Sequence, residues 1–270
     1  MKKPWIILST GSCHKYGLYR FFEMAKKAGF KELELVIDEQ YDSQEPAYIK
    51  QLERKFNLKV VSVHSAMEFV SDWGEWENRL KKSIKLAKDI KAQYLVVHSW
   101  DNQDKEYLEW LITNQKKLAR SASPVKITIE NATCRYDTET KVQKNPSYHF
   151  DVMKQFDSIN LDLSHIGTAE MDLIEYYDQI KDKITHIHFS DSDSRIDERH
   201  PEKILDCHFV PGKGKHPLKK FLSLLKSDSF SGPISIELWS DRFAKNVTEE
   251  VVIKNLKFSK KFIETYFSAR

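Results

Sequence analysis

Cysteine is scarce in this chain. The 270 residues include three cysteines, Cys13, Cys134 and Cys207, and no Cys-x-x-Cys pair. An odd number without paired spacing excludes a disulfide-stapled secreted scaffold and a paired-cysteine zinc or redox motif. A reducing compartment fits this usage of cysteine.

Long apolar runs and an excess of one charge are also missing. The early run Trp5–Ser9 is too short for a signal-peptide core or a membrane span, so we expect a first β-strand there. Lysine and arginine total 43 against 40 acidic residues, and the net charge of +3 does not demand a nucleic-acid partner. These absences predict a cytoplasmic protein that does not bind a membrane.

Glycine-rich nucleotide motifs and linkers are absent as well. Neither G-x-G-x-x-G nor G-x-x-x-x-G-K-[ST] follows an apolar run, and no Gly/Pro-rich segment divides the chain. We therefore expect a single domain that covers residues 1–270.

Short apolar runs instead alternate with longer amphipathic stretches along the whole sequence. The predicted strands are Trp5–Ser9, Glu32–Val36, Lys59–His64, Tyr94–His98, Lys126–Glu130, Ile159–Asp162, Ile184–Phe189 and Ile234–Leu238. The predicted helices are Leu18–Ala28, Pro46–Phe56, Glu75–Ile90, Lys105–Arg120, Ser147–Gln155, Ala169–Ile180, Leu218–Lys226 and Thr248–Phe267. This alternation predicts an α/β fold, a single (β/α)8 TIM barrel; a doubly wound open sheet is the rival but usually has fewer units at this length.

Polar residues occupy every second position at the end of five predicted strands. The pairs are Ser62/His64, Thr128/Glu130, Asn160/Asp162, His186/His188 and Ser235/Glu237. Alternate residues of a barrel strand face the lumen, and barrel enzymes keep their sites at the carboxyl ends of the strands. We therefore expect these polar ends to converge on one site.

Side chains that can bind a metal gather at or near these strand ends. They are His64, His98, Glu130, Asp162, His165, His188, Asp206, His208 and Glu237. Without a cation, so many carboxylates in one cavity would repel one another. Mixed imidazole and carboxylate sets suit zinc or manganese, so the sequence predicts a divalent metal centre.

Four short motifs carry a resemblance to a known family. They are DLSH at 162–165, HFSD at 188–191, Asp-x-His at 206–208 followed by VPGKG, and IEL at 236–238. With these motifs, nearly the whole chain resembles the xylose isomerase-like TIM-barrel superfamily. That superfamily includes sugar isomerases and epimerases as well as endonuclease IV, the apurinic-site endonuclease.

The two branches imply different metal contents. Resemblance to endonuclease IV implies a trinuclear zinc cluster with three ligand sets: His64, His98 and Glu130; Glu130, Asp162, His188 and Glu237; and His165, Asp206 and His208. Glu130 would bridge the first two ions. Resemblance to the sugar isomerases implies one ion, commonly manganese, magnesium or cobalt, held by Glu130, Asp162, His188 or His208, and Glu237.

Three departures separate the chain from endonuclease IV. The segment at 36–46 is acidic where a basic DNA-recognition loop would lie, no tyrosine occurs in SAMEF after His64, and Lys213 stands where a glutamate is usual. An acidic loop opposes binding to a phosphodiester backbone. The phrase AGFKELELV at 28–36 resembles the sugar isomerase and epimerase branch instead.

We therefore expect a metal-dependent isomerase or epimerase whose partner is a small sugar or sugar phosphate. Glu130 and Glu237 would exchange a proton at a carbon next to a carbonyl. The alternative is a zinc phosphoesterase that acts on nucleic acid, and a third possibility is a barrel that binds a metabolite without turning it over.

Five other residues are open to more than one interpretation. His186 is expected to be a buried structural histidine that supports the site from behind, and Glu34 to form an internal ion pair. Lys213 is either an exposed loop lysine or a contact for a substrate anion. Trp76, like Trp73, either covers the barrel mouth or caps a helix.

Overall fold

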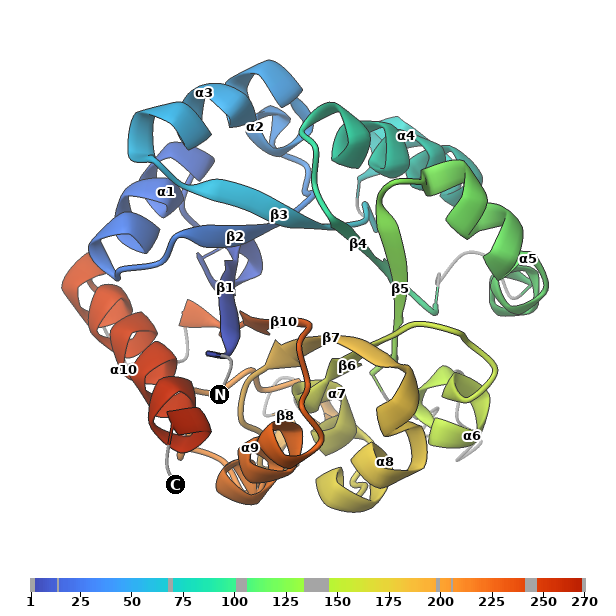
Figure 1. Cartoon of the computed structure of the whole chain (residues 1–270), viewed down its shortest axis with the longest axis vertical. Helices are drawn as coiled ribbons and strands as arrows, with labels where there is room; N and C mark the ends of the chain where they lie inside the picture. The colour runs from blue at the N-terminus through green and yellow to red at the C-terminus, as the bar shows by residue number, and fades with distance from the viewer. Residues whose placement is uncertain are drawn as a thin grey trace.

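The strands form a closed barrel, as the sequence predicts. The computed structural model describes residues 3–13, 15–67, 70–100, 106–133, 146–197, 200–204, 206–240 and 247–268. The barrel strands are parallel and follow the order β1-β10-β7-β6-β5-β4-β3-β2 (Figure 1). Their bounds are β1 Trp5–Ser9, β2 Glu32–Val36, β3 Lys59–His64, β4 Tyr94–His98, β5 Lys126–Glu130, β6 Ile159–Asp162, β7 Ile184–Phe189 and β10 Pro233–Ile236.

Helices surround the barrel, and the last one closes the ring between α9 and α1 (Figure 1). The α-helices are α1 Leu18–Lys27, α2 Tyr41–Gln44, α3 Pro46–Phe56, α4 Trp76–Asp89, α5 Tyr107–Ala122, α6 Phe150–Met153, α7 Leu163–Thr168, α8 Leu173–Ile180, α9 Leu218–Ser227 and α10 Glu249–Ser268. Short 3-10 turns are η1 Thr10–Cys13, η2 Ser71–Trp73, η3 Pro146–Tyr148 and η4 Lys181–Lys183. None of the described helices has the length and apolar character needed to cross a membrane.

The apolar core lies between the strands and the helices, and the lumen is polar. Phe21 and Phe22 of α1, Tyr176 of α8 and Phe221 of α9 are almost completely buried. Inside the barrel many of the buried side chains are instead polar, among them Glu34, Ser62, Thr128, Asn160, His186 and Ser235. Apolar burial therefore stabilises the outer layer, while the lumen depends on hydrogen bonds and ion pairs.

Four segments differ from the sequence expectation. The helix predicted at Ser147–Gln155 is divided into η3 and α6, and the one predicted at Ala169–Ile180 begins only at Leu173. The α7 helix lies directly after β6, because Asp162 Oδ1 accepts a hydrogen bond from the His165 amide at 3.0 Å and caps it. An antiparallel hairpin of β8 (Ile196–Asp197) and β9 (His200–Ile204) was not predicted.

Candidate metal centre

The predicted ligands converge at the carboxyl ends of the strands. His64, His98, Glu130 and Asp162 are the last residues of β3, β4, β5 and β6. Three overlapping groups have candidate ligand atoms within 4.8 Å of one another: His64, His98 and Glu130; Glu130, Asp162, His188 and Glu237; and Asp162, His165 and His208. The barrel therefore brings together side chains that are up to 173 residues apart in sequence, from His64 to Glu237.

Glu130 is shared by the first two groups. Its Oε2 lies 3.0 Å from His64 Nε2 and 3.4 Å from His98 Nε2, and its Oε1 lies 3.1 Å from His188 Nδ1. Burial alone would raise the pKa of Glu130, but the charge of His188 and hydrogen bonds from His188 and His64 hold it well below its usual range. Glu130 is consequently an ionised carboxylate with one oxygen available to each group.

Asp206 joins the third group at its edge. Its Oδ2 lies 3.5 Å from His165 Nε2, and its Oδ1 lies 3.2 Å from His208 Nε2. Burial opposes the charged imidazole, yet Asp206 and Asp162 raise the pKa of His208 to about 9. Asp197 and His200 are backbone register partners in the β8–β9 hairpin.

Backbone carbonyls fix three of the imidazoles in one orientation. His64 Nδ1 lies 3.1 Å from the Ser65 carbonyl, His165 Nδ1 2.7 Å from the Asn131 carbonyl, and His208 Nδ1 3.3 Å from the Glu237 carbonyl. Because a carbonyl only accepts hydrogen bonds, each Nδ1 carries the proton and donates it. Each Nε2 then faces a carboxylate of the site, and a bound metal ion would displace the proton of that nitrogen and receive its lone pair.

His188 has the reverse orientation. Its Nδ1 lies 2.9 Å from Glu237 Oε2 and 3.3 Å from Asp162 Oδ2, while its Nε2 lies 2.9 Å from Glu34 Oε1 below the site. Burial lowers the imidazole pKa, but Glu237, Glu34 and Glu130 together raise the pKa of His188 well above its usual value. Glu34 thus holds the ring so that Nδ1 faces the cluster.

The base of the site is a buried polar network around Glu34. Glu34 accepts hydrogen bonds from Ser62 Oγ at 2.7 Å and Ser235 Oγ at 3.0 Å, and its Oε2 lies 3.1 Å from His186 Nε2. Glu34 forms the expected ion pair with His188, whose pKa is raised. Burial lowers the pKa of His186, so this ring is a neutral neighbour of Glu34. His186 is completely buried, as expected, but it contacts Glu34 and Asn160 rather than one of the predicted ligand carboxylates.

The residues present fit a divalent cation. Asp162 Oδ2 is buried and has no aligned hydrogen-bond donor among the described residues, although His188 Nδ1 is near it. A buried carboxylate oxygen without a donor is costly, and a cation between the acidic groups would satisfy it. Burial and the neighbouring imidazoles also lower the pKa of His98 to about 3 despite Glu130, so this ring is neutral and able to ligate.

Three supporting residues could not be recognised in the sequence. Ser9 Oγ donates to Glu237 Oε1 at 3.2 Å, and a Cβ on Gly11 would lie 2.5 Å from the same oxygen. Asn131 joins two strand ends, since its Oδ1 accepts from the Asp162 amide at 2.8 Å. Their roles depend on which strands are neighbours, and no local sequence signal carries that information.

A fourth such residue, Asp191 of the HFSD motif, organises the turn that contains Lys213. Its carboxylate accepts hydrogen bonds from the backbone amides of Ser192, Gly212, Gly214 and His216 at 2.8 to 3.2 Å. A side chain on Gly214 would lie 2.4 Å from the Ser192 carbonyl, so this position requires glycine. Lys213 itself is exposed on the turn.

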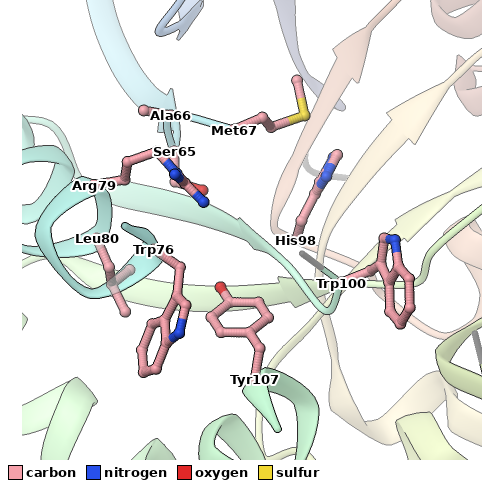
Figure 2. Close-up of a pocket in the computed structure, with 9 residues that line it drawn as sticks. All are labelled: Ser65, Ala66, Met67, Trp76, Arg79, Leu80, His98, Trp100 and Tyr107. Atoms are coloured by element: carbon pink, nitrogen blue, oxygen red, sulfur yellow. The ribbon is translucent and has the colours of Figure 1, made fainter. Parts of the chain in front are cut away.

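A small hollow of about 20 Å³ opens beside the first group, and His98 forms part of its wall (Figure 2). Trp76, Tyr107 and Arg79 come from the surrounding helices, and Trp100 comes from the segment after β4. Trp76 therefore lies at the barrel mouth. Trp73 is buried instead, and its Nε1 donates to Gln44 Oε1 at 2.8 Å.

The fold and the site together define a (β/α)8 barrel with a carboxylate and imidazole centre at its C-terminal mouth. Residues 22–262 match the family described as xylose isomerase-like TIM barrel, and the chain belongs to that family. An uncharacterized protein of Mycobacterium leprae is 27% identical over 280 residues, which span 95% of this chain and 96% of the relative.

Two solved structures have the same fold at low sequence identity. A structure of the IolI protein with a bound zinc atom has a TM-score of 0.71 and 20% identity, and covers 98% of this chain and 100% of its own. D-allulose 3-epimerase from Methylomonas sp., in complex with D-allulose, has a TM-score of 0.70 and 15% identity over 98% of both chains. At such identities these matches show the shared fold.

Proposed function

We propose that the protein is a divalent-metal-dependent isomerase or epimerase of a small sugar or sugar phosphate. The observation that carries the proposal is the group of Glu130, Asp162, His188 and Glu237, whose ligand atoms lie within 4.8 Å of one another. Support also comes from the epimerase and the zinc-bound protein among the structural neighbours. A cation held by these residues, zinc or manganese by donor type, would polarise a substrate carbonyl and hydroxyl.

The two glutamates are placed to exchange protons. Glu130 ends β5 and Glu237 follows β10, so they approach the site from strands that are separated by β6 and β7. One carboxylate removes the proton from the carbon next to the carbonyl, and a proton is returned to the resulting enediolate either by that same carboxylate, now protonated, or by the other carboxylate after it has taken a proton from water. A proton returned to the opposite face of the same carbon gives the epimer, and a proton returned to the neighbouring carbon gives the isomer.

Solvent exchange tests this function directly. Metal-loaded protein is incubated with ketoses in D2O, and deuterium incorporation next to the carbonyl is followed by NMR. We expect incorporation in the wild type and a loss of about 100-fold or more in Glu237→Gln, since general-base catalysis typically contributes that much. Glu32→Gln, which removes a carboxylate at the base of β2, is the matched control. No exchange with any ketose would contradict the proposal.

A phosphoesterase is the second candidate, and the two additional groups favour it. His64 and His98 on one side, and His165 and His208 on the other, extend the central group to a size that could hold about three zinc ions. Metal analysis of protein purified without added metal separates the candidates. Three zinc ions per chain, with nicking of abasic-site DNA that is lost in Glu130→Ala, would replace the sugar proposal, whereas one exchangeable manganese supports it.

A further inference from the structure

We propose that a hollow at the N-terminal end of the barrel, remote from the metal centre, binds a small amphipathic anion, a molecule with an apolar body and one anionic head group. This basal hollow has a volume of about 660 Å³ and lies between residues 88–94 and residues 124–126. Its volume falls within the range of about 300–1,000 Å³ that is usual for ligand pockets. Binding there goes beyond the function proposed above and does not depend on it.

The basal hollow and the metal centre lie at opposite ends of the same two strands. Tyr94 and Lys126 line the hollow and are the first residues of the neighbouring strands β4 and β5 (Figure 1). His98 and Glu130 of the metal centre are the last residues of these strands. A strand of this length spans roughly 13 Å, so the hollow is a separate site and not an extension of the substrate site.

The floor of the basal hollow is apolar and is fixed by the backbone. Ala92 and Val125 are almost completely buried, and the half-buried ring of Tyr94 adds to the apolar surface. The Lys126 amide donates to the Gln93 carbonyl at 2.8 Å, which ties the two connecting segments together. A pre-formed apolar floor gains free energy when an alkyl or aryl group covers it, and it loses little conformational entropy on binding.

The charged groups around this floor are all positive. Lys88, Lys91 and Lys126 line the basal hollow, and none of the described residues that line it is acidic. Within the described part of the chain, neither Lys91 nor Lys126 has a carboxylate at ion-pair distance. Lys88 is held at the edge, because its Nζ donates to the Ser121 carbonyl at 2.6 Å. A hollow with low-dielectric walls and charges of one sign concentrates ions of the opposite sign.

Lys126 gives a second reason to expect an anion. Partial burial lowers the pKa of Lys126, because its ammonium group loses part of its hydration. An anionic head group beside this ammonium would offset that cost, while the apolar body of the ligand covers Ala92 and Val125. The side-chain amide of Gln93, which also lines the hollow, is a neutral hydrogen-bond donor for the same head group.

Three small probes test the site without an assay of turnover. They are octanoate; 1-octanol, which has the tail without the charge; and acetate, which has the charge without the tail. Calorimetry measures their Kd for the full chain, both metal-loaded and after treatment with a chelator. We expect octanoate to bind at least about tenfold more tightly than either of the other probes in both forms. Equal binding of octanoate and 1-octanol by the wild type would overturn the proposal.

A double variant assigns the head group to the lysines. In Lys91→Met/Lys126→Met, the Kd of 1-octanol and that of octanoate should come to within about twofold of each other. Both lysines are exposed, so the variant should fold. The matched control is Lys116→Met/Lys117→Met, which removes the same charge from the exposed surface of α5 and should keep the wild-type preference. A preference retained in K91M/K126M, or lost equally in K116M/K117M, would contradict the assignment.

Amide NMR spectra of the metal-free protein locate the bound probe. We expect octanoate to shift the signals of Ala92, Gln93 and Val125 and to leave those of His98 and Glu130 unchanged. Shifts confined to the metal centre, or binding that occurs only in metal-loaded protein, would place the carboxylate at that centre and overturn the basal site. Proton exchange in ketoses, the test of the proposed function, involves none of the residues of the basal hollow, so either result can fail without the other.

Discussion

At the scale of single residues, the orientation of His188 depends on a side chain that cannot touch the substrate. Glu34 lies below the metal centre, fully buried, with Oε1 2.9 Å from His188 Nε2. A negative partner behind an imidazole fixes the ring and raises the basicity of its other nitrogen. Glu34 is therefore a positioning residue for the ring that faces Glu130, Asp162 and Glu237.

Glu34→Gln should weaken metal binding while leaving the barrel folded. Gln keeps an acceptor for His188 Nε2 but removes the charge, so we expect the Kd for manganese or zinc to rise about 10- to 100-fold, the usual effect of changing such a partner. Metal titration of chelator-treated protein measures it. Glu32→Gln is the control, because Glu32 lies on the same strand and accepts a hydrogen bond from Trp5 Nε1. This variant should bind metal like the wild type. Unchanged affinity in E34Q would rule out this role for Glu34.

Cys13 should make stability depend on pH in the alkaline range. Burial raises the pKa of the Cys13 thiol to about 12, whereas an unfolded cysteine ionises near 8.5. Below 8.5 the thiol is protonated in both states; above it the unfolded chain loses the proton first, so stability falls by about 1.4 kcal/mol per pH unit until about 12.

Urea unfolding of the wild type and of Cys13→Ala at several pH values isolates this effect. The packing loss in C13A does not change with pH. The difference in free energy of unfolding between the wild type and C13A should therefore shrink by about 1.4 kcal/mol from pH 9 to pH 10. A difference that stays constant over this interval would mean that the thiol ionises in the folded protein as readily as in the unfolded chain.

The sequence indicates most of the candidate ligand residues, but it indicates few of the residues that hold those ligands in place. Alternation along the strands indicates which residues face the lumen, so His64, Glu130 and Asp162 could be predicted to converge. The contact between Glu34 and His188 could not, because β2 and β7 are not neighbours and meet only across the lumen. Asn131 is equally invisible, since its role depends on the position of the Asp162 backbone on the next strand.

At the scale of elements, regular structure was easier to predict than its exceptions. The bounds of β1 to β7 agree with the predicted strands, because each strand has apolar side chains under the helices that alternate with side chains facing the lumen. The β8–β9 hairpin was missed because RIDERHPEK at 195–203 is charged and has no period-two apolar pattern. The α7 helix was missed because its six residues are too few to show a helical apolar period.

The turn at 210–216 depends on the carboxylate of Asp191, and Asp191→Asn should destabilise it. One of the two carboxylate oxygens becomes an amide N–H₂, which would face backbone N–H donors from Gly212 and Gly214 or from Ser192 and His216. Leaving buried donors without an acceptor costs about 1–3 kcal/mol each, so we expect a loss of about 2–4 kcal/mol in urea unfolding and faster amide exchange at 212–216.

Asp193→Asn is the matched control for this element. Asp193 lies two residues further on and pairs with the exposed Arg195. Surface ion pairs contribute about 0–1 kcal/mol, so this variant should remain close to the wild type. Equal losses in D191N and D193N would indicate a general effect of charge on this segment instead of a specific anchor for the turn.

At the scale of the whole molecule, the barrel gathers ionisable groups in its lumen and at its mouth, where they add little to the stability of the fold. The lumen and its mouth contain buried imidazoles and carboxylates in contact, and the apolar core is confined to the layer between strands and helices. A buried ion pair contributes little net stability because desolvation offsets the attraction. A cation that binds only the folded barrel would add stability through mass action.

Removal of metal should consequently lower the melting temperature. At a free metal concentration of about 100 times Kd, binding stabilises the folded state by about 2.7 kcal/mol, which corresponds to about 5–10 °C for a domain of this size. Calorimetry with and without chelator measures the shift. The shift should be abolished in Glu130→Ala, because Glu130 belongs to two of the ligand groups, and retained in Glu32→Gln. If chelation leaves the melting temperature of the wild type unchanged, the convergent side chains stabilise one another without an ion, and both proposed chemistries lose their foundation.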